Sequence, residues 1–240
     1  MSGPRLLLYG ATGNSGARLA EALAPLGDRL LLGGRDGDAL HALGNRLGLS
    51  VRRFGLEDPA LLGRALDGAD VVLNAAGPYA ATALPLARAC ITTGTDYLDL
   101  SGEWPSFEAL LALDEPARAR GVMLLPGVAV AILVSDCLLA AAARLFPRVA
   151  ALRLGLSRPH ILGRGSIRTM FGLADTHALV RVNGQLERVS AHRHIRDFDF
   201  GAGPVRASAF SWPDVITVER STGVGSFAAF VETATVERAT

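Results

Sequence analysis

Hydrophobic residues follow two alternating patterns along the first half of the chain. Short, nearly continuous apolar runs alternate with longer stretches in which apolar residues return every three or four positions. The runs are typical of strands buried on both faces, and the stretches are typical of helices with one buried face. The runs that predict strands are residues 5–9, 29–34, 50–54, 70–77, 96–101 and 122–127. The stretches that predict helices are residues 14–26, 38–47, a segment opened by Asp58 and Pro59, 84–93, 105–120 and 135–145.

This alternation predicts the architecture of the first part of the chain. Buried strands that alternate with helices pair in parallel, because the connecting helices then cover both faces of the sheet. Right-handed crossovers wind such a sheet in two directions from its centre. The fold class predicted for residues 1–146 is therefore α/β, a Rossmann-like doubly wound parallel sheet.

The pattern changes after Pro147. Alternation with a period of two, typical of half-buried strands, takes over in residues 149–157, 178–189, 215–220 and 226–233. The dipeptide Asn183-Gly184 separates two alternating runs, which is the signal of a tight β-hairpin. A single helix is expected around residues 167–173. Residues 147–240 are therefore predicted to form a smaller α+β domain with a mostly antiparallel sheet, for substrate binding or dimerisation.

The overall composition narrows the classes of partner. The chain of 240 residues is 50% hydrophobic and 20% charged, and its formal net charge is +1 at pH 7. These values are typical of a globular protein and disfavour a basic face for nucleic acid. The two cysteines, Cys90 and Cys137, have no spacing that suggests a disulfide framework or a metal site. We expect the partner to be a small-molecule substrate, with neither nucleic acid nor a metal ion bound.

Two further absences in the sequence limit location and chemistry. The longest apolar stretch, residues 122–134, is shorter than a membrane span and is interrupted by Pro126 and Gly127. No basic segment followed by an apolar one opens the chain, so we expect a cytoplasmic protein. The chain contains no lysine, which excludes a lysine Schiff base, a P-loop and the Tyr-x-x-x-Lys pair of short-chain dehydrogenases.

The segment "GATGNSG" joins the first predicted strand to the first predicted helix. Gly10 would allow a tight turn, Gly13 would let the backbone approach a pyrophosphate, and Gly16 would let the helix pack closely. The N terminus of the helix adds free N–H groups and a partial positive charge that favour an anion. The segment is consistent with a dinucleotide site and with a structural turn. The other residues expected to contact a dinucleotide here are Ala11, Thr12, Asn14 and Ser15.

The end of the second predicted strand bears on the choice of cofactor. In NAD sites an acidic residue about 20 positions after the glycines holds the ribose hydroxyls. Gly34 stands near that place, and Arg35 follows it. An arginine can bind a 2′-phosphate through its fork of N–H groups, so NADP is favoured and NAD is the alternative. Asp36 reads as the cap of the next helix, and Arg35 could also be an ordinary surface residue.

The segment "NAAGPY" follows the fourth predicted strand. Ligands of open α/β sheets bind at the carboxyl ends of the strands. Ala75, Ala76 and Gly77 would leave room for the ribose and nicotinamide of the cofactor, and Pro78 and Tyr79 would line the substrate side.

The segment "DLSGEW" follows the fifth predicted strand and belongs to the same edge. Ser101 and Glu103 are candidates for polar contacts with substrate. Alternatively, Asp99 or Ser101 caps the helix that follows.

Several segments of the chain together resemble one protein family. "YGATGNSG", "GGRD", "NAAGPYAATALPLARACITTGTDYLDLSGE" and "LLPGVAVAILVSDCL" are similar to the saccharopine dehydrogenase-like NAD(P)-binding family, and within it to the trans-acting enoyl reductase group. The resemblance continues through "GRGSIRTM" and "DFDFGAGPVRASAFSWPDVITVERSTGV" and covers most of the chain. It implies a Rossmann domain for NAD(P) in residues 1–146, an α+β domain in residues 147–240, and redox chemistry in a cleft between them.

The chain departs from the family pattern in two places. Where the family has a glycine-aromatic-aspartate run and then a proline, this sequence has Ala129, Val130, Ala131 and Val134. The acidic group that the run would supply to the substrate cleft is therefore missing. Family members also usually continue beyond the position of Thr240. We therefore expect a shortened second domain, with a cleft that is open or covered by a partner subunit in a homo-oligomer.

These features lead to three functional hypotheses. In the first, the protein is an NADP-dependent oxidoreductase that acts on a small unsaturated, carbonyl or imine substrate. Tyr79 and Glu103 are then the candidates for moving the proton, with His160 and His177 behind them. In the second, it binds NADP(H) without catalysis, as a regulatory or structural protein. In the third, the glycine turn is vestigial and exposed sheet edges drive self-association.

Overall fold

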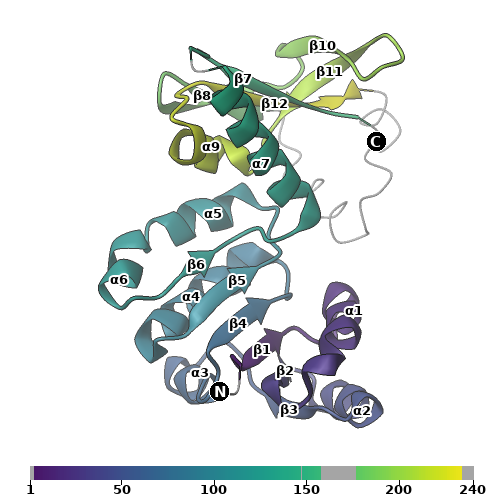
Figure 1. Cartoon of the computed structure of the whole chain (residues 1–240), viewed down its shortest axis with the longest axis vertical. Helices are drawn as coiled ribbons and strands as arrows, with labels where there is room; N and C mark the ends of the chain where they lie inside the picture. Colours follow the sequence, from purple (N-terminus) through teal and green to yellow (C-terminus); the bar gives the residue numbers. More distant parts are fainter. Residues whose placement is uncertain (1–2, 147, 158–176, 234–240) are drawn as a thin grey trace. The chain divides into compact units, whose positions relative to one another are not determined.

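The chain folds into two compact units, drawn in Figure 1. The residues that this computed structural model describes are 3–146, 148–157 and 177–233. The first unit comprises Met1–Ser101 and Pro105–Ala129, and the second comprises Gly102–Trp104 and Val130–Thr240. Helix α7 (Val130–Leu145), which the sequence analysis assigned to the first domain, packs against a helix of the second unit.

The first unit is built on a six-stranded sheet in which every pair of neighbouring strands is parallel. Its strands are β1 (Leu6–Tyr9), β2 (Leu30–Gly34), β3 (Ser50–Arg53), β4 (Val71–Asn74), β5 (Asp96–Asp99) and β6 (Leu124–Leu125). They lie in the order β3-β2-β1-β4-β5-β6, so the winding of the chain reverses between β1 and β4. The predicted Rossmann-like sheet is confirmed, and β1 and β4 flank the position where such sheets bind ligands.

Helices cover both faces of this sheet. They are α1 (Asn14–Leu23), the 3-10 segment η1 (Ala24–Arg29), α2 (Gly37–Leu47), α3 (Pro59–Ala65), α4 (Tyr79–Thr93), α5 (Trp104–Leu111) and α6 (Asp114–Ala119). Figure 1 shows α1 and α2 on one side of the sheet and α3 and α4 on the other.

Strand β1 supplies both hydrophobic cores of the first unit, because successive side chains point to opposite faces. Leu8 packs in one core with Ala20 of α1 and Leu40 of α2. Leu7 packs in the other core with Leu86 of α4. These side chains are fully buried, which explains the continuous apolar run that predicts this strand.

The largest differences from the expected helix boundaries occur in three places. Helix α4 starts at Tyr79 rather than at residue 84, and it carries Pro85 in its interior, although proline usually marks the first turn of a helix. The stretch 105–120 forms two helices, α5 and α6, instead of one. Helix α7 begins five residues before the predicted residue 135. The predicted caps Asp36 and Asp58 are confirmed, since both accept backbone N–H groups of the helices that they precede.

The second unit contains a sheet with mostly antiparallel pairing, as predicted. Its strands are β7 (Leu152–Leu156), β8 (His177–Val182), β9 (Gln185–Ser190), β10 (Ile195–Asp199), β11 (Pro204–Phe210) and β12 (Phe227–Glu232). They follow the order β10-β11-β12-β8-β9, and β7 pairs with β12 in the parallel direction. The predicted hairpin is confirmed between β8 and β9, where Asn183 and Gly184 both have positive φ.

One predicted strand of the second unit is wrong. Residues 215–220 lie inside helix α9 (Asp214–Thr222), because Pro213 stands at its N-cap and Gly223 ends it in the left-handed conformation. The helix buries Val215 and Val218 on one face, and this packing outweighs the preference of β-branched residues for strands. The helix expected around residues 167–173 lies outside the described residues. No helix in the described ranges has the length and apolarity needed to cross a membrane.

Candidate dinucleotide-binding site

The glycine-rich segment forms a tight turn between β1 and α1 at the carboxyl edge of the sheet. Gly10 has a φ of +79°, and its N–H donates to the Gly33 carbonyl at 2.9 Å. The N–H of Gly13 donates to the Gly10 carbonyl at 3.0 Å, and Gly13 is the N-cap residue of α1. The turn therefore places Gly13 at the start of the helix, as the sequence predicts.

The three glycines of this turn meet different surroundings. A Cβ atom on Gly10 would come within 2.8 Å of the Ala76 backbone nitrogen, and one on Gly16 would collide with the Gly10 carbonyl oxygen. A Cβ on Gly13 would meet only that same carbonyl oxygen, at 3.2 Å, among the described residues. Packing thus requires glycine at Gly10 and Gly16, whereas Gly13 has an open side that a phosphate could approach.

The N terminus of α1 suits an anion. No side chain caps it, and its first turn contains no acidic residue. The side chains of Thr12, Asn14 and Ser15 are exposed around it, whereas Ala11 and Gly16 are buried. The partial positive charge of the helix N terminus is therefore not neutralised by the protein itself.

The end of β2 offers a cation, Arg35, and a carboxylate, Asp36, that caps the next helix. Gly34 is buried and Arg35 is exposed. Asp36 is the N-cap of α2, where its Oδ1 accepts from the Ala39 N–H at 3.1 Å. Through Oδ1, the carboxylate that could hold ribose hydroxyls in an NAD site is therefore also engaged with the helix.

Sequence reasoning missed a second arginine beside Arg35. Arg53, at the end of β3, is exposed, and its Nε donates to the Arg35 carbonyl at 3.1 Å. The neighbouring Arg52 binds a different part of the unit, because its Nη1 donates to the carbonyls of Ala65 and Asp67 at 2.6 and 3.0 Å. The available signal was that a strand ending in two arginines pairs with the strand that precedes Arg35.

The segment after β4 lies against the glycine turn. The N–H of Ala75 donates to the Tyr9 carbonyl at 2.8 Å, and Ala76 is the residue that approaches Gly10. Gly77 and Pro78 are exposed and are joined by a cis peptide bond. The first unit therefore brings the predicted residues of the glycine turn and of this segment together.

Three buried polar side chains at the ends of β4 and β5 were not among the predicted site residues as a group. Asn74, Tyr97 and Asp99 all have 0% exposure, and hydrogen bonds connect them. Asp99, which the sequence analysis considered as a helix cap, accepts from the N–H groups of Ser101 and Gly127, both at 2.8 Å. Their signal in the sequence was the presence of polar residues, Asn74 and Asp99, at the last positions of two predicted strand cores.

The candidates for proton transfer belong to both units. Tyr79 is half-buried at the first position of α4, directly after the exposed Gly77-Pro78 segment. Glu103 is buried before α5, in a short segment that belongs to the second unit. His177 is exposed at the start of β8, also in the second unit, and His160 lies outside the described residues. Among the candidates that the structure describes, Tyr79 belongs to the same unit as the glycine turn.

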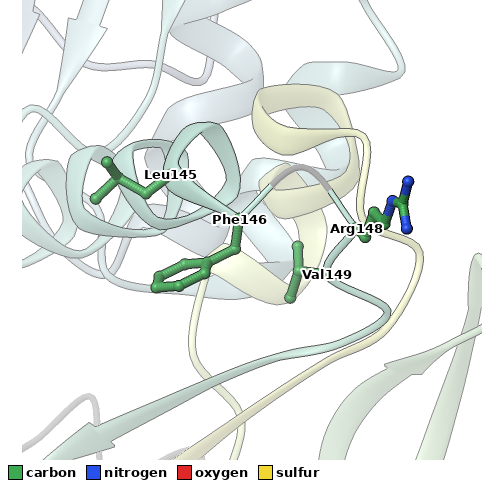
Figure 2. Close-up of a pocket in the computed structure, with 4 residues that line it drawn as sticks. All are labelled: Leu145, Phe146, Arg148 and Val149. Atoms are coloured by element: carbon green, nitrogen blue, oxygen red, sulfur yellow. The ribbon is translucent and has the colours of Figure 1, made fainter.

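Two pockets lie in the described part of the structure. One has a volume of about 480 Å³ and is lined by Leu145, Phe146, Arg148 and Val149, after helix α7, as Figure 2 shows. The other has a volume of about 210 Å³ and lies among α5, α6 and β6. Neither contains a residue of the predicted cofactor site.

The second unit contains one carboxyl group in an unusual environment. Asp214, with 0% exposure, accepts from the Ser135 hydroxyl at Oδ2, 2.8 Å away, and its Oδ1 has no hydrogen-bond partner among the described residues. Trp212 Nε1 donates to the same hydroxyl at 3.1 Å. Burial raises the pKa of Asp214 to about 7, the hydrogen bond from Ser135 lowers it, and the nearby charge of Asp136 raises it.

Most of the first unit matches a known protein family. A sequence model described as the saccharopine dehydrogenase NADP binding domain matches residues 6–125. This range runs from β1 to β6 and includes every residue of the turn, Arg35 and the segment after β4. The resemblance that the motifs predict is therefore confirmed.

Curated relatives and a solved structure extend the comparison. The trans-acting enoyl reductase of Mycobacterium leprae (strain TN) is 41% identical over 105 residues, which cover 41% of this chain and 25% of that protein. The trans-acting enoyl reductase of Mycobacterium ulcerans (strain Agy99) is 39% identical, also over 105 residues that cover 41% of this chain and 25% of that protein. The matched part is thus a quarter of each relative's length. Apo saccharopine dehydrogenase (L-Glu forming) from Saccharomyces cerevisiae has a TM-score of 0.65 at 16% identity, over 95% of this chain and 55% of that one. At that identity, the likeness concerns the fold.

Proposed function

The chain belongs to the saccharopine dehydrogenase NADP-binding domain family, and on this premise we propose that it binds NADP(H) and acts as an oxidoreductase. The observation that carries the proposal is the turn from Gly10 to Gly16. It has an open side at Gly13, an uncapped helix N terminus, and a position beside the reversal of strand order. These features meet the requirements of a pyrophosphate site independently of the family match.

The preference for NADP over NAD rests on the ends of β2 and β3. Arg35 and Arg53 are exposed there next to each other, and Asp36 is occupied as a helix cap. A 2′-phosphate carries the negative charge that two guanidinium groups favour, and guanidinium forks match phosphate geometry. The unphosphorylated ribose of NAD would offer these guanidinium groups no such charge.

We assign the remaining predicted contacts by their exposure. Thr12, Asn14 and Ser15 have exposed side chains that can add hydrogen bonds to phosphate, while Ala11 and Gly16 serve through the backbone. Ala75 to Pro78 would face the ribose and nicotinamide, since Ala76 lies against the glycine turn and the next two residues are exposed.

The proposed reaction is a reduction or oxidation of a small unsaturated, carbonyl or imine substrate. When bound, the reduced cofactor supplies a hydride, and reduction of the substrate is balanced by one proton. Tyr79 is the residue proposed to move that proton, because it follows the exposed Gly77-Pro78 segment directly. Glu103 is the second candidate. The enoyl reductase relatives favour a substrate with a carbon–carbon double bond.

Fluorescence titration with NADPH and NADH tests the cofactor part of this proposal. We expect saturable binding of NADPH that is at least about tenfold tighter than that of NADH, and loss of this preference in Arg35→Ala. Arg46→Ala is the matched control, because Arg46 is an exposed arginine of the same unit that pairs with Glu21 at 2.8 Å. Absence of saturable binding at millimolar cofactor would remove the proposal.

A second candidate function is binding of NADP(H) without catalysis. It is favoured by the absence of lysine and by Ala129, Val130 and Ala131, where the family pattern has an acidic residue. Consumption of NADPH with a panel of aldehyde, imine and enoyl substrates separates the two functions. Turnover of any of these substrates would exclude the non-catalytic one. In either case we propose a homo-oligomer, which light scattering can test.

A further inference from the structure

A chain of buried hydrogen bonds connects the carboxyl ends of β4 and β5. The Tyr97 hydroxyl donates to Asp99 Oδ2 at 2.8 Å and accepts from Asn74 Nδ2 at 3.1 Å. Burial raises the pKa of Tyr97 well above its usual value, and the charge of Asp99 raises it further. The Tyr97 hydroxyl therefore keeps its proton and donates a hydrogen bond to the Asp99 carboxylate.

At the end of β4, these hydrogen bonds hold both the N–H and the carbonyl of one residue, Ala76. The Ala76 N–H donates to Asn74 Oδ1 at 3.0 Å. The Ala76 carbonyl accepts from the Thr82 hydroxyl at 2.6 Å, and that hydroxyl in turn accepts from Asn74 Nδ2 at 3.1 Å. Both polar backbone groups of Ala76 are thus fixed by side chains rather than by a neighbouring strand.

At the end of β5, Asp99 binds the loops that follow β5 and β6. Asp99 Oδ1 accepts from the N–H groups of Ser101 and Gly127, and the Asp99 carbonyl accepts from the N–H of Val128, all at 2.8 Å. The loops after three neighbouring strands are therefore joined through Asn74, Tyr97 and Asp99.

The contact of this hydrogen-bond network with Ala76 points to a role in ligand binding. Ala76 is the residue that touches the glycine turn at Gly10, and the exposed Gly77 and Pro78 follow it. A shift of Ala76 would move these exposed residues relative to the turn. Stability alone does not require this arrangement, because well-packed apolar groups can replace buried polar pairs at little cost.

We propose that Tyr97 and Asp99 are positioning residues for the nicotinamide half of the bound dinucleotide, acting through Asn74 and Thr82 on Ala76. The inference rests on the proposed function, since it requires that the segment after β4 face the nicotinamide. Neither Tyr97 nor Asp99 has exposed surface, so neither is expected to touch the ligand itself.

Two ligands that differ only in the nicotinamide half provide the test. The full protein is titrated with NADPH and with 2′,5′-ADP, which contains the adenosine and the 2′-phosphate but no nicotinamide. Tyr97→Phe removes the hydroxyl and keeps the ring. Thr82→Val is a milder second variant at a half-buried site, and it removes the bond to the Ala76 carbonyl. Thr95→Val is the matched control, because it removes a buried hydroxyl at the opposite end of β5, where Thr95 donates to the Ala69 carbonyl.

The expected result is a selective loss. NADPH should bind roughly fivefold to tenfold more weakly to Tyr97→Phe and Thr82→Val, while 2′,5′-ADP binds all variants as it binds the original protein. Thr95→Val should leave both affinities unchanged. Unchanged NADPH affinity in the first two variants, or an equal loss for both ligands, would overturn the inference. If the original protein bound neither ligand, the proposed function would fail instead, and the inference with it.

Discussion

Gly10 and Ala76 are in contact across the reversal of strand order between β1 and β4. A Cβ atom built on Gly10 would lie 2.8 Å from both the backbone nitrogen and the Cβ of Ala76. This contact joins the turn proposed for the pyrophosphate to the segment proposed for the nicotinamide. This contact and the hydrogen bond from Ala75 to the Tyr9 carbonyl hold the two halves of the candidate site together.

Substitution of Gly10 should damage both the fold and binding. Gly10→Ala adds a Cβ at a φ of +79° and against the Ala76 backbone, so we expect a loss of at least about 2 kcal/mol in unfolding free energy. NADPH binding should fall with it. Gly63→Ala is the matched control, because a Cβ at Gly63 in α3 would meet nothing within 4 Å among the described residues. That control should be stabilised by roughly 0.5–1 kcal/mol. Urea unfolding measures both changes, and equal stabilities of the two variants would contradict the prediction.

Substitution of Gly13 should separate binding from stability. Among the described residues, a methyl group on Gly13 meets only the Gly10 carbonyl oxygen, at 3.2 Å, so the thermal midpoint should fall less in Gly13→Ala than in Gly10→Ala. The same methyl group occupies the open side of the turn, and we expect NADPH affinity to fall roughly tenfold or more. Calorimetric titration together with a thermal melt checks this pair of effects. Normal affinity in this variant would place the pyrophosphate elsewhere.

Arg53 should contribute to selection of the 2′-phosphate. In Arg53→Ala we expect NADPH and 2′,5′-ADP to bind roughly threefold to tenfold more weakly, because one charge-assisted contact is lost, while NADH binding stays the same. The comparison with Arg46→Ala controls for the loss of one positive charge from the same unit. A similar weakening of NADH would show that Arg53 acts on the turn and not on the 2′-phosphate.

The second unit should lose stability as the pH rises, because of Asp214. Its pKa is about 7 in the folded chain and about 3.9 when unfolded, so the native state retains a proton that the unfolded state releases between these values. This contribution is complete below about pH 4 and is lost as the pH rises through 7, by up to about 4 kcal/mol. A protonated Asp214 can donate to the Ser135 hydroxyl, which then donates to the Ile132 carbonyl 3.0 Å away.

Asp214→Asn should remove this pH dependence, because an amide donates to Ser135 at any pH. Urea unfolding of the two proteins between pH 4 and 8 measures the difference. Asp197→Asn, an exposed substitution in the same unit, should retain the dependence of the original protein. Parallel stability curves for the original protein and Asp214→Asn would contradict the raised pKa.

The sequence was sufficient to predict the first unit's sheet and its glycine turn, because both depend on local patterns. The buried runs in β1, β2 and β4 and the spacing of Gly10, Gly13 and Gly16 fix strand, turn and helix over short distances. Asp36 and Asp58 were recognised as caps for the same reason: a cap and its helix are adjacent in the chain. The hairpin at Asn183-Gly184 follows from the φ values that these residues tolerate.

What the sequence could not reveal depends on partners that are distant in the chain. Arg53 lies beside Arg35 only because β3 pairs with β2. The pairing alone does not show that Arg53 is exposed there while Arg52 binds carbonyls near the end of α3. The link from Asp99 through Tyr97 to Asn74 requires the side-by-side placement of β4 and β5. Helix α9 was mistaken for a strand because its burial against the rest of the second unit outweighs the local preference of Val215 and Ile216.

The most direct measurement of the central claim is a crystal structure of the protein in complex with NADP. The account predicts the pyrophosphate at Gly13 and the N terminus of α1, the 2′-phosphate beside Arg35 and Arg53, and the nicotinamide beside Ala76, Gly77 and Pro78. A dinucleotide bound away from the carboxyl ends of β1 and β4, or bound there with its nicotinamide on the side of β2, would contradict it.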